Sequence, residues 1–594
     1  MVEKSAVYKD HRSLAQGFGI CTVAVLLLYF LSGMNAVKMR EIHLSLLMAI
    51  LTASCVFYVT CAFVKSYKRF VSLVSFIPAL GIYYLIFKLS FDACDRKTLP
   101  ALSVMEGVLF WAGIGTVLVS VLVLFAGHKL EDGDLVTAVL ASGFVLRTVM
   151  VLFTPLNFYQ HDVSSFSPDQ AGFHDSYILY VYENLTLPDG DVRDLGQFYH
   201  PPLHYFLSAL LLRLHNALPW RFSGDVNGLK MLPMLWTSYL ILFGKKILEH
   251  FEIKGKALAF SLMLIVFCPQ MVFLSIQVNN DAVALMFFIA SLYLGFKWYS
   301  KPEMTTVLFL AITIGCAMMS KLSMGFVAFP VAWLFLARLI RAVKEKKSKK
   351  GGIKVADLIK QFAGFAVLVF PLGLWFPLRN LICYGTPITY VYVIDPTAGQ
   401  GVWMYSTWQR LFAPSKAILG TPFLHEGGEF SDYNIFLGIL KSGLFDERFF
   451  ESQYLTAVAR VMLCLAFVLM VAVTFIAVAG TLKSLRKTGG KFIDATENAA
   501  LLILVVVLTV SEIVFCFNYP VVCTEAFRYI APVLIPAACW TGRYIGQCGE
   551  KGTDTFRKVS SEAFMVLTAM FVLTVILFYG PFIQYQLPWE TLIG

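Results

Sequence analysis

Long apolar runs alternate with short polar segments along most of the 594-residue chain. Runs of roughly 20 apolar residues recur, and each is long enough to cross a bilayer as a helix. The pattern therefore predicts an all-α, polytopic integral membrane protein. Candidate spans lie near residues 18–34, 43–64, 70–90, 103–127, 135–154, 203–219, 229–248, 257–276, 282–299, 304–320, 322–340, 358–379, 454–480, 498–518, 529–546 and 562–583.

The composition agrees with this pattern and excludes a water-soluble protein. Hydrophobic residues make up 58% of the chain and charged residues only 14%, so a soluble domain of this size would expose large apolar patches. The net charge is +10, but its positive residues gather in short loops at Lys65–Arg69, Arg338–Lys354 and Lys483–Lys491. Such clusters indicate cytoplasmic loops beside anionic lipid, not nucleic-acid binding.

The orientation follows from counting spans between these basic loops. With the N-terminus inside, the loop 155–202 lies outside, after the fifth span. Counting back from the second basic loop also places the turn Asn279–Asp281 and the segment 380–453 outside. The two counts differ by one crossing. We therefore expect either 203–219 or 229–248 not to cross completely.

Four regions are expected along the chain. They are an N-terminal transmembrane scaffold (1–130), a transmembrane core with its outer loop (131–379), an outer-face segment (380–453) and C-terminal transmembrane helices (454–594).

The outer loop concentrates groups that can carry chemistry. Asp162 comes directly after a span, where partial burial tunes a carboxylate for general-base work. A solvated acidic loop is the alternative. The loop also holds a set of histidines and a further acid that can surround a substrate or support Asp162: His161, His174, Asp175, His200 and His204. His200-Pro-Pro-Leu-His204 opens the next helix, and its two prolines fix the backbone there.

A metal centre in this loop is a weaker interpretation. Its histidines and aspartates are potential ligands, but their spacing matches no compact metal motif. No cofactor and no metal ligand are therefore assigned, and a divalent ion stays an open alternative.

A second group of polar residues lies between or within apolar runs. Asn280 and Asp281 stand where two spans meet, either as a helix cap or as part of a substrate site. Arg147, Lys321 and Arg528 are cations in apolar surroundings, and a lipid phosphate is a suitable partner for them. Snorkelling to the interface is the alternative.

These residues resemble a known superfamily. Gln160-His-Asp-Val163, Phe198-Tyr-His-Pro-Pro-Leu-His204, Gln277-Val-Asn-Asn-Asp281 and Lys321-Leu-Ser323 look like motifs of the GT-C membrane glycosyltransferases. The nearest branch is that of the protein O-mannosyltransferases and the bacterial lipid A aminoarabinose transferases, chiefly its bacterial members. The resemblance covers about residues 135–400.

The resemblance implies a polyprenyl-phosphate sugar donor and roles for individual residues. Asp162 would deprotonate the acceptor, and Asp281 would match the later acid of the site. His200 stands where relatives place a lysine near the donor phosphate, and His161 stands where many have a second acid.

We therefore expect a hexosyl- or pentosyltransferase that acts on the outer face of a bacterial plasma membrane, with inversion at the anomeric carbon. Its partners would be the donor lipid and a glycan, lipid or protein acceptor. Donor-phosphate candidates are His200, His204, Arg147, Lys321 and Arg528, whereas His161, His174, Asp175 and Asn280 would contact the acceptor or support the catalytic groups. The alternatives are a transporter or lipid flippase, and a non-catalytic assembly factor.

Overall fold

The computed structural model describes residues 130–580 apart from short gaps, together with parts of 110–128. The scaffold expected for 1–130 therefore lies almost wholly outside the described residues. The gaps are 155, 157–158, 164–165, 167–171, 218–228, 348–352, 393–398, 414–420, 427–428, 431, 451, 486–492 and 551–552.

Helices make up nearly all of the regular structure in the described part of the chain. The α-helices are α5 (Asp132–Phe153), α6 (His174–Asn184), α7 (Leu203–Ala217), α8 (Met231–His250), α9 (Gly255–Val266), α10 (Pro269–Phe273), α11 (Asp281–Ser300), α12 (Met304–Ser320), α13 (Ala328–Lys347), α14 (Val355–Tyr384), α15 (Thr407–Phe412), α16 (Ile435–Phe445), α17 (Gln453–Leu485), α18 (Ala495–Asn518), α19 (Leu534–Cys548) and α20 (Thr555–Tyr579). Short 3₁₀ turns are η2 (Val192–Asp194), η3 (Gly196–Tyr199), η5 (Leu322–Val327), η6 (Val522–Thr524), η7 (Phe527–Tyr529) and η8 (Ala531–Val533). A two-residue hairpin, β1 (His425–Glu426) with β2 (Glu429–Phe430), is the sheet structure seen here.

Seven helical segments of the described chain are long and apolar enough to cross a membrane. Each coincides with a span predicted from the sequence, so the all-α polytopic fold is confirmed. They are Asp132–Val151, Asp281–Ser300, Leu322–Glu345, Val355–Tyr384, Gln453–Ser484, Ala495–Asn518 and Thr555–Tyr579.

Two of the predicted spans are interrupted. The run at 257–276 divides into α9 and α10, because Pro269 has no N–H for a continuous helix and instead starts a new one. The run at 529–546 belongs to a broken element, in which Val522–Tyr529 and Ala531–Cys548 meet at a bend of 42°. Both interruptions occur where the chain reaches the candidate site.

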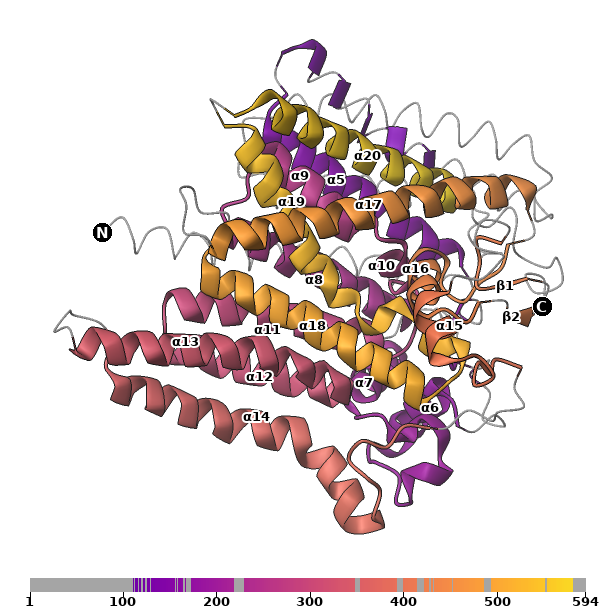
Figure 1. Ribbon diagram of the computed structural model, residues 1–594. Coiled ribbons are helices and arrows are strands. Elements are labelled where there is room, and N and C mark those ends of the chain that lie inside the picture. Colours follow the sequence, from indigo (N-terminus) through magenta and orange to yellow (C-terminus); the bar gives the residue numbers. More distant parts are fainter. Residues whose placement is uncertain are drawn as a thin grey trace.

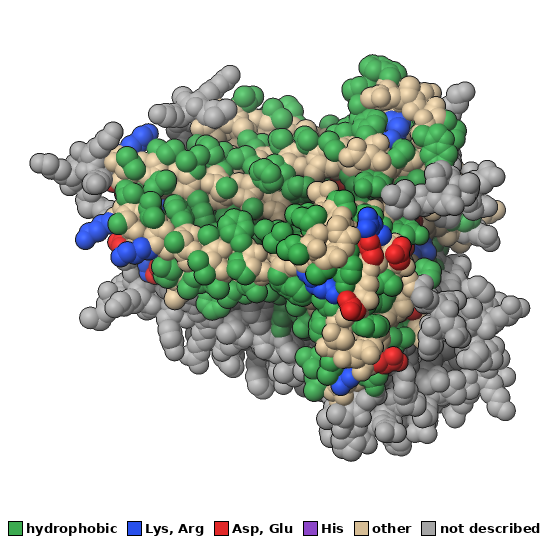
Figure 2. Space-filling view, turned by 90° about the horizontal axis from the view of Figure 1, so that it is seen from below, with side chains coloured by type: hydrophobic (Ala, Val, Ile, Leu, Met, Phe, Trp, Pro, Cys, Tyr) green, Lys and Arg blue, Asp and Glu red, His purple; other side chains and the backbone are tan. Residues whose placement is uncertain are grey.

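The helices differ in what covers them. The apolar windows of α5 and α11 are 83% and 78% buried, whereas those of Leu322–Glu345 and α14 are only 28% buried. Exposed side chains such as Phe329, Val367 and Phe370 project from α13 and α14. Figure 2 shows the result as a broad band of hydrophobic side chains between two ends that carry charged groups. This band is the surface expected to face lipid.

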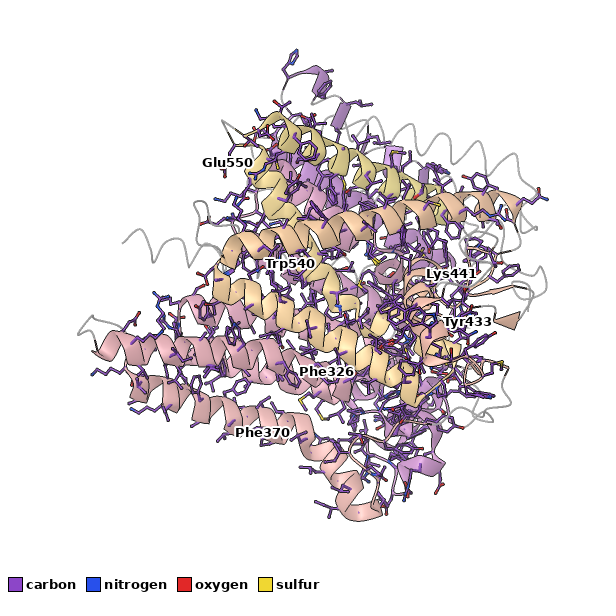
Figure 3. The ribbon with its side chains drawn as sticks, viewed as in Figure 1. Phe326, Phe370, Tyr433, Lys441, Trp540 and Glu550 are labelled. Atoms are coloured by element: carbon purple, nitrogen blue, oxygen red, sulfur yellow. The ribbon has the colours of Figure 1, made fainter. Side chains whose placement is uncertain are left out.

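Helices α12, α13, α14, α17 and α18 run side by side across Figure 1. One end of this bundle, at the right of the picture, gathers α6, α15, α16 and the β1–β2 hairpin. Tyr433 and Lys441 lie at that end, and Glu550 lies at the opposite one (Figure 3). The bundle thus separates an end rich in irregular structure from an end of short connections.

Buried ion pairs hold the segment between α14 and α17 in place. Lys441 donates to the Asp432 carboxylate at 2.5 Å and to the carbonyl oxygens of Thr421 and Phe423, and both charged side chains are fully buried. Arg410 pairs with the buried Glu525 at 3.3 Å. These contacts tie α15, α16 and the intervening loop to the bend before α19.

The Lys441–Asp432 pair gives a stability prediction. Lys441→Met is expected to destabilise the protein by about 3–5 kcal/mol, because it leaves a buried carboxylate without its ammonium partner. Thermal unfolding in detergent measures the loss. The double variant Lys441→Met with Asp432→Leu is the control, since it removes both charges and should recover most of the stability. A single variant as stable as the wild type would contradict the prediction.

Candidate functional site

Three segments far apart in the sequence meet at the end that carries α6, α15 and α16. The Gln160 side chain donates to the Ile276 carbonyl at 2.8 Å and accepts from the Val278 N–H at 2.7 Å. Arg448 donates to the Gln160 carbonyl at 2.7 Å. The outer loop, the turn before α11 and the segment after α16 are therefore joined by direct hydrogen bonds.

Asp281 lies at the centre of this junction, at the first position of α11. Its buried carboxylate forms an ion pair with Lys321 and lies 3.5 Å from Nε of Arg528. Asn280 donates to the Ser320 carbonyl at 2.9 Å, which holds the end of α12 beside the start of α11. Lys321 directly follows Ser320, so this contact brings the ammonium group to Asp281.

Arg528 is buried, yet part of its guanidinium has no partner. Its exposed fraction is 7%. Nη2 lies 3.6 Å from Glu447 Oε1 and 3.3 Å from the Tyr529 hydroxyl. Nη1, however, has no hydrogen-bond partner among the described residues. A buried guanidinium N–H left in this state is costly, so it is a site where an anionic ligand would be stabilised.

A cavity of about 930 Å³ opens beside Arg528. Asp162 also lines it, on a backbone with φ of +53° that a hydrogen bond from the His174 N–H to the Asp162 carbonyl holds at 2.8 Å. The Asp162 side chain is exposed and has no ion pair within the described part of the chain. The cavity is thus lined by a carboxylate that has no ion pair among the described residues and by a guanidinium whose Nη1 is still available to an anion. Other lining residues are His161, Glu447, Tyr199, Tyr529, Phe173, Gln197, Gln400 and Trp403.

His161 is part of a buried network. Its Nε2 donates to both oxygens of Asp446 at 2.9 and 2.8 Å, and Gln277 donates to the same carboxylate at 2.7 Å. Burial raises the pKa of Asp446, but the hydrogen-bonded His161 ring and the charges of Arg448 and Arg528 together lower it below the ordinary value. The Asp446 carboxylate is therefore ionised and fixes the orientation of the His161 ring.

The same network is the one cluster of metal-ligand type in the part of the chain that the structure describes. Donor atoms of His161, Asp446 and Glu447 lie within 4.8 Å of one another. Asp446 already accepts three hydrogen bonds, and the Arg528 guanidinium faces Glu447 at 3.6 Å. A cation beside two occupied carboxylates disfavours a divalent ion, so these residues fit an ion-pair network better than a metal centre.

His174 and His200 lie in a stack of aromatic rings. Their rings are 5.4 Å apart, His174 Nδ1 is 2.7 Å from the Tyr205 hydroxyl, and Tyr199 packs against His200 at 4.0 Å. Burial, followed by neighbouring positive charges, lowers the pKa of both histidines well below the ordinary value. Both are therefore neutral and cannot attract a phosphate by charge. Of the phosphate-binding candidates, Arg528 and Lys321 are the two that form ion pairs with acidic residues of this site.

Of the candidates predicted from the sequence, His161, Asp162 and Arg528 line the cavity, and the others do not. Arg147 donates to the carbonyl oxygens of Gly143 and Val266 at 3.0 and 2.8 Å, between α5 and α9, so the structure does not bring it to the other phosphate-binding candidates. His204 is buried edge-on to Tyr205. Asp175 accepts from the Phe166 N–H at 2.8 Å and shapes the loop.

Sequence reasoning missed two acids of this site, Asp446 and Glu447. They lie in Phe445-Asp-Glu-Arg-Phe-Phe450, an acidic pair between aromatic residues on the segment expected outside. That pair was the available signal. Immediately before Asp162 the chain has His161, and the structure brings these two carboxylates to it from almost 300 residues away.

Comparisons with known proteins agree with a membrane glycosyltransferase. Residues 199–359, less than half of the chain, match the dolichyl-phosphate-mannose-protein mannosyltransferase family model. No curated protein matches the chain in sequence.

Two solved structures are similar to part of this chain. The Archaeoglobus fulgidus oligosaccharyltransferase in its apo form is 13% identical over 75% of this chain and 56% of that chain, with a TM-score of 0.39. The oligosaccharyltransferase AglB from Archaeoglobus fulgidus, in complex with an inhibitory peptide and a dolichol-phosphate, is 13% identical over 75% of this chain and 55% of that chain, with a TM-score of 0.40. This chain thus spans little more than half the length of those proteins, and at these TM-scores neither defines its function.

The family match includes the last residues of the 155–202 loop, all of α7 to α13 and the ion-paired Asp281 and Lys321. Taken with the seven apolar spans, it confirms the resemblance of this chain to the GT-C superfamily of membrane glycosyltransferases.

Proposed function

We propose that the protein transfers a hexosyl or pentosyl unit from a polyprenyl-phosphate donor to an acceptor at the outer face of a bacterial plasma membrane. The observation that carries the proposal is the buried Arg528 guanidinium, whose Nη1 is unpartnered beside a cavity that also holds Asp162. The description of the matched family names a dolichyl-phosphate-linked sugar, whose phosphate is an anion that Arg528 could bind.

The transfer requires in-line attack, removal of a proton and stabilisation of the leaving phosphate, and different residues carry out the last two. The acceptor hydroxyl attacks the anomeric carbon in line with the bond to the phosphate oxygen. Asp162 takes the hydroxyl proton as the new glycosidic bond forms. The phosphate leaves with the electron pair of the broken bond, and Arg528 and Lys321 stabilise its charge. One displacement of this kind inverts the anomeric centre.

Ion pairs and hydrogen bonds around the cavity hold these groups in fixed positions. Asp281 holds Lys321 and Arg528 on one side, and Glu447 holds Arg528 on the other. Asp446 orients His161 next to Asp162. Because the cations are anchored before the donor binds, little reorganisation is needed when charge develops on the leaving phosphate.

The test is release of polyprenyl phosphate by the full-length protein in lipid nanodiscs. A panel of polyprenyl-phosphate sugars, with hexoses and pentoses, is offered with and without a chelator. We expect release from at least one donor, and we expect it to survive chelation because no step requires a metal.

Three other results would change the proposal. Loss of release on chelation would make His161, Asp446 and Glu447 a metal site. Retention of configuration in the product would exclude a single displacement. Absence of release from every donor, with lipid binding intact, would favour a transporter, a flippase or an assembly factor.

A further inference from the structure

The cavity beside Arg528 extends to a mouth lined by exposed aromatic rings. Phe173, Tyr392 and Trp403 line it and have exposed fractions of 39%, 47% and 51%. Large rings left this open beside a cavity lose contact with water only when a ligand covers them. None of the three takes part in the proton transfer or phosphate binding proposed above.

Two side-chain amides of the cavity lining have a buried oxygen with unused hydrogen-bonding capacity. Oε1 of Gln197 and Oε1 of Gln400 are buried and have no hydrogen-bond partner among the described residues. Both residues line the cavity. A buried amide oxygen without a partner costs free energy, so each marks a place where a ligand group would be favourable.

One arm of the mouth pairs Phe173 with Gln197. The Gln197 N–H donates to the Gly172 carbonyl at 2.9 Å, which brings the glutamine beside the residue that precedes Phe173. Gly196 has φ of +61°, and a Cβ there would lie 2.3 Å from the Gly172 oxygen. The two backbones can approach this closely only because position 196 is glycine.

The other arm pairs Trp403 with Gln400. Residues 400–402 run antiparallel to 520–522: the Val402 N–H donates to the Pro520 carbonyl at 2.9 Å, and the Val522 N–H donates to the Gln400 carbonyl at 3.0 Å. The Trp403 ring lies over Gly401, where a Cβ would come within 1.8 Å of the ring. The backbone that carries the ring and the amide is thus held in place before any ligand arrives.

We propose that these two arms form a saccharide-binding subsite, so that the acceptor of the transfer is a glycan. The proposal rests on the proposed transferase function. Each arm offers an aromatic face beside an amide. The C–H groups on one face of a sugar ring pack against the electron-rich face of an aromatic ring. Sugar hydroxyls both donate and accept, so they satisfy either atom of each amide.

The chemistry of the mouth fits a neutral glycan better than an anionic surface. Arg193 lines the cavity but is held by Asp191 at 2.5 Å, and the lining also includes the carboxylates of Glu183 and Asp194. Anionic lipid headgroups would be repelled by these acids. The cationic groups that could bind phosphate lie deeper, at Arg528.

The test separates the acceptor from the donor. The full-length protein in nanodiscs is given the donor that supports release, together with neutral oligosaccharides of mannose, glucose or N-acetylglucosamine, or with a Ser/Thr-rich peptide. Transfer to water without acceptor reports the donor site alone. We expect at least one oligosaccharide to accept sugar. Trp403→Ala should raise the acceptor KM about tenfold, with hydrolysis of the donor unchanged.

Further variants test whether the loss of acceptor affinity comes from the Trp403 ring. Gly401→Ala, which displaces the ring, should behave as Trp403→Ala, whereas Trp403→Phe should keep most of the affinity. Trp408→Ala is the control, because Trp408 is a 68% exposed tryptophan of the same segment that does not line the cavity. Direct binding of the same oligosaccharides by wild type and Trp403→Ala gives a readout that does not require turnover.

The outcomes distinguish the two proposals. Transfer to the peptide alone, or oligosaccharide transfer with a KM that Trp403→Ala does not change, would overturn the saccharide subsite and leave the transferase standing. If no donor is hydrolysed and no oligosaccharide binds, both proposals fail. If oligosaccharides bind through Trp403 without any donor release, the transferase fails and the subsite stands.

Discussion

Replacement of Asp162 by asparagine is expected to slow release of polyprenyl phosphate by about 10²–10⁴-fold, the usual contribution of a general base. Asparagine has nearly the same shape but cannot accept the hydroxyl proton. The Asp162 side chain is exposed and has no ion pair among the described residues, so the substitution breaks no salt bridge there. The fall should therefore appear in kcat, with the thermal unfolding temperature and the affinity for donor unchanged.

Variants of two other carboxylates serve as the control and as the alternative base for this prediction. Asp189→Asn is the control, because Asp189 lies on the same loop, accepts from the Tyr384 hydroxyl at 2.7 Å and does not line the cavity. It should keep wild-type turnover. Glu447 is the rival base, since it lines the cavity opposite Arg528. If Glu447→Gln abolished release while Asp162→Asn retained it, the base would be Glu447 and the assignment of Asp162 would be wrong.

The membrane architecture could be predicted from the sequence because lipid allows few backbone solutions. A spanning segment must satisfy its own hydrogen bonds and present apolar side chains, so its signal is local in the chain. All seven long apolar helices of the described chain carry that signal. The breaks at Pro269 and at Ile530 were harder to predict, since apolar residues continue through both of them.

The site could be predicted only in part because its contacts are not local. The Asn280-Asp281 turn and Lys321 stood out as polar residues in apolar surroundings, and the structure pairs Asp281 with Lys321 across 40 residues. Nothing in the local pattern around His161 indicates that Asp446 is its partner. Arg147 carried the same signal as Arg528, but its guanidinium donates to carbonyl oxygens of α5 and of the last residue of α9.

The close contacts of the glycines also could not be predicted from the sequence, because they too are not local. Gly172, Gly196 and Gly401 are ordinary loop glycines in the sequence. Only the fold shows that a Cβ at Gly196 would meet a carbonyl and that a Cβ at Gly401 would meet an indole ring. The aromatic mouth of the cavity therefore follows from backbone approach, which spacing along the chain does not encode.

Replacement of Arg528 by glutamine is expected to lower kcat/KM for the donor by about 10²–10³-fold, because it removes a preorganised cation from the leaving phosphate. The same change should weaken inhibition by added polyprenyl phosphate about 10–100-fold, the value of a charge-assisted hydrogen bond. Arg528→Lys should recover part of both, since it restores the charge without the planar fork. Asp162→Asn should leave the inhibition constant for polyprenyl phosphate unchanged. Measuring this constant in both variants therefore distinguishes the roles of the two residues.

Arg528 also opposes Asp281 and Glu447, so the loss of activity needs a control for stability. In Arg528→Gln the buried Asp281 keeps Lys321 as a partner, whereas the half-buried Glu447 loses the guanidinium, and the protein should unfold at a lower temperature. Adding Glu447→Gln removes one of those charges and should restore part of the stability. If this double variant also regained inhibition by polyprenyl phosphate, Arg528 would be a structural cation. If stability returned and inhibition did not, the unpartnered Nη1 of Arg528 is the group that holds the phosphate.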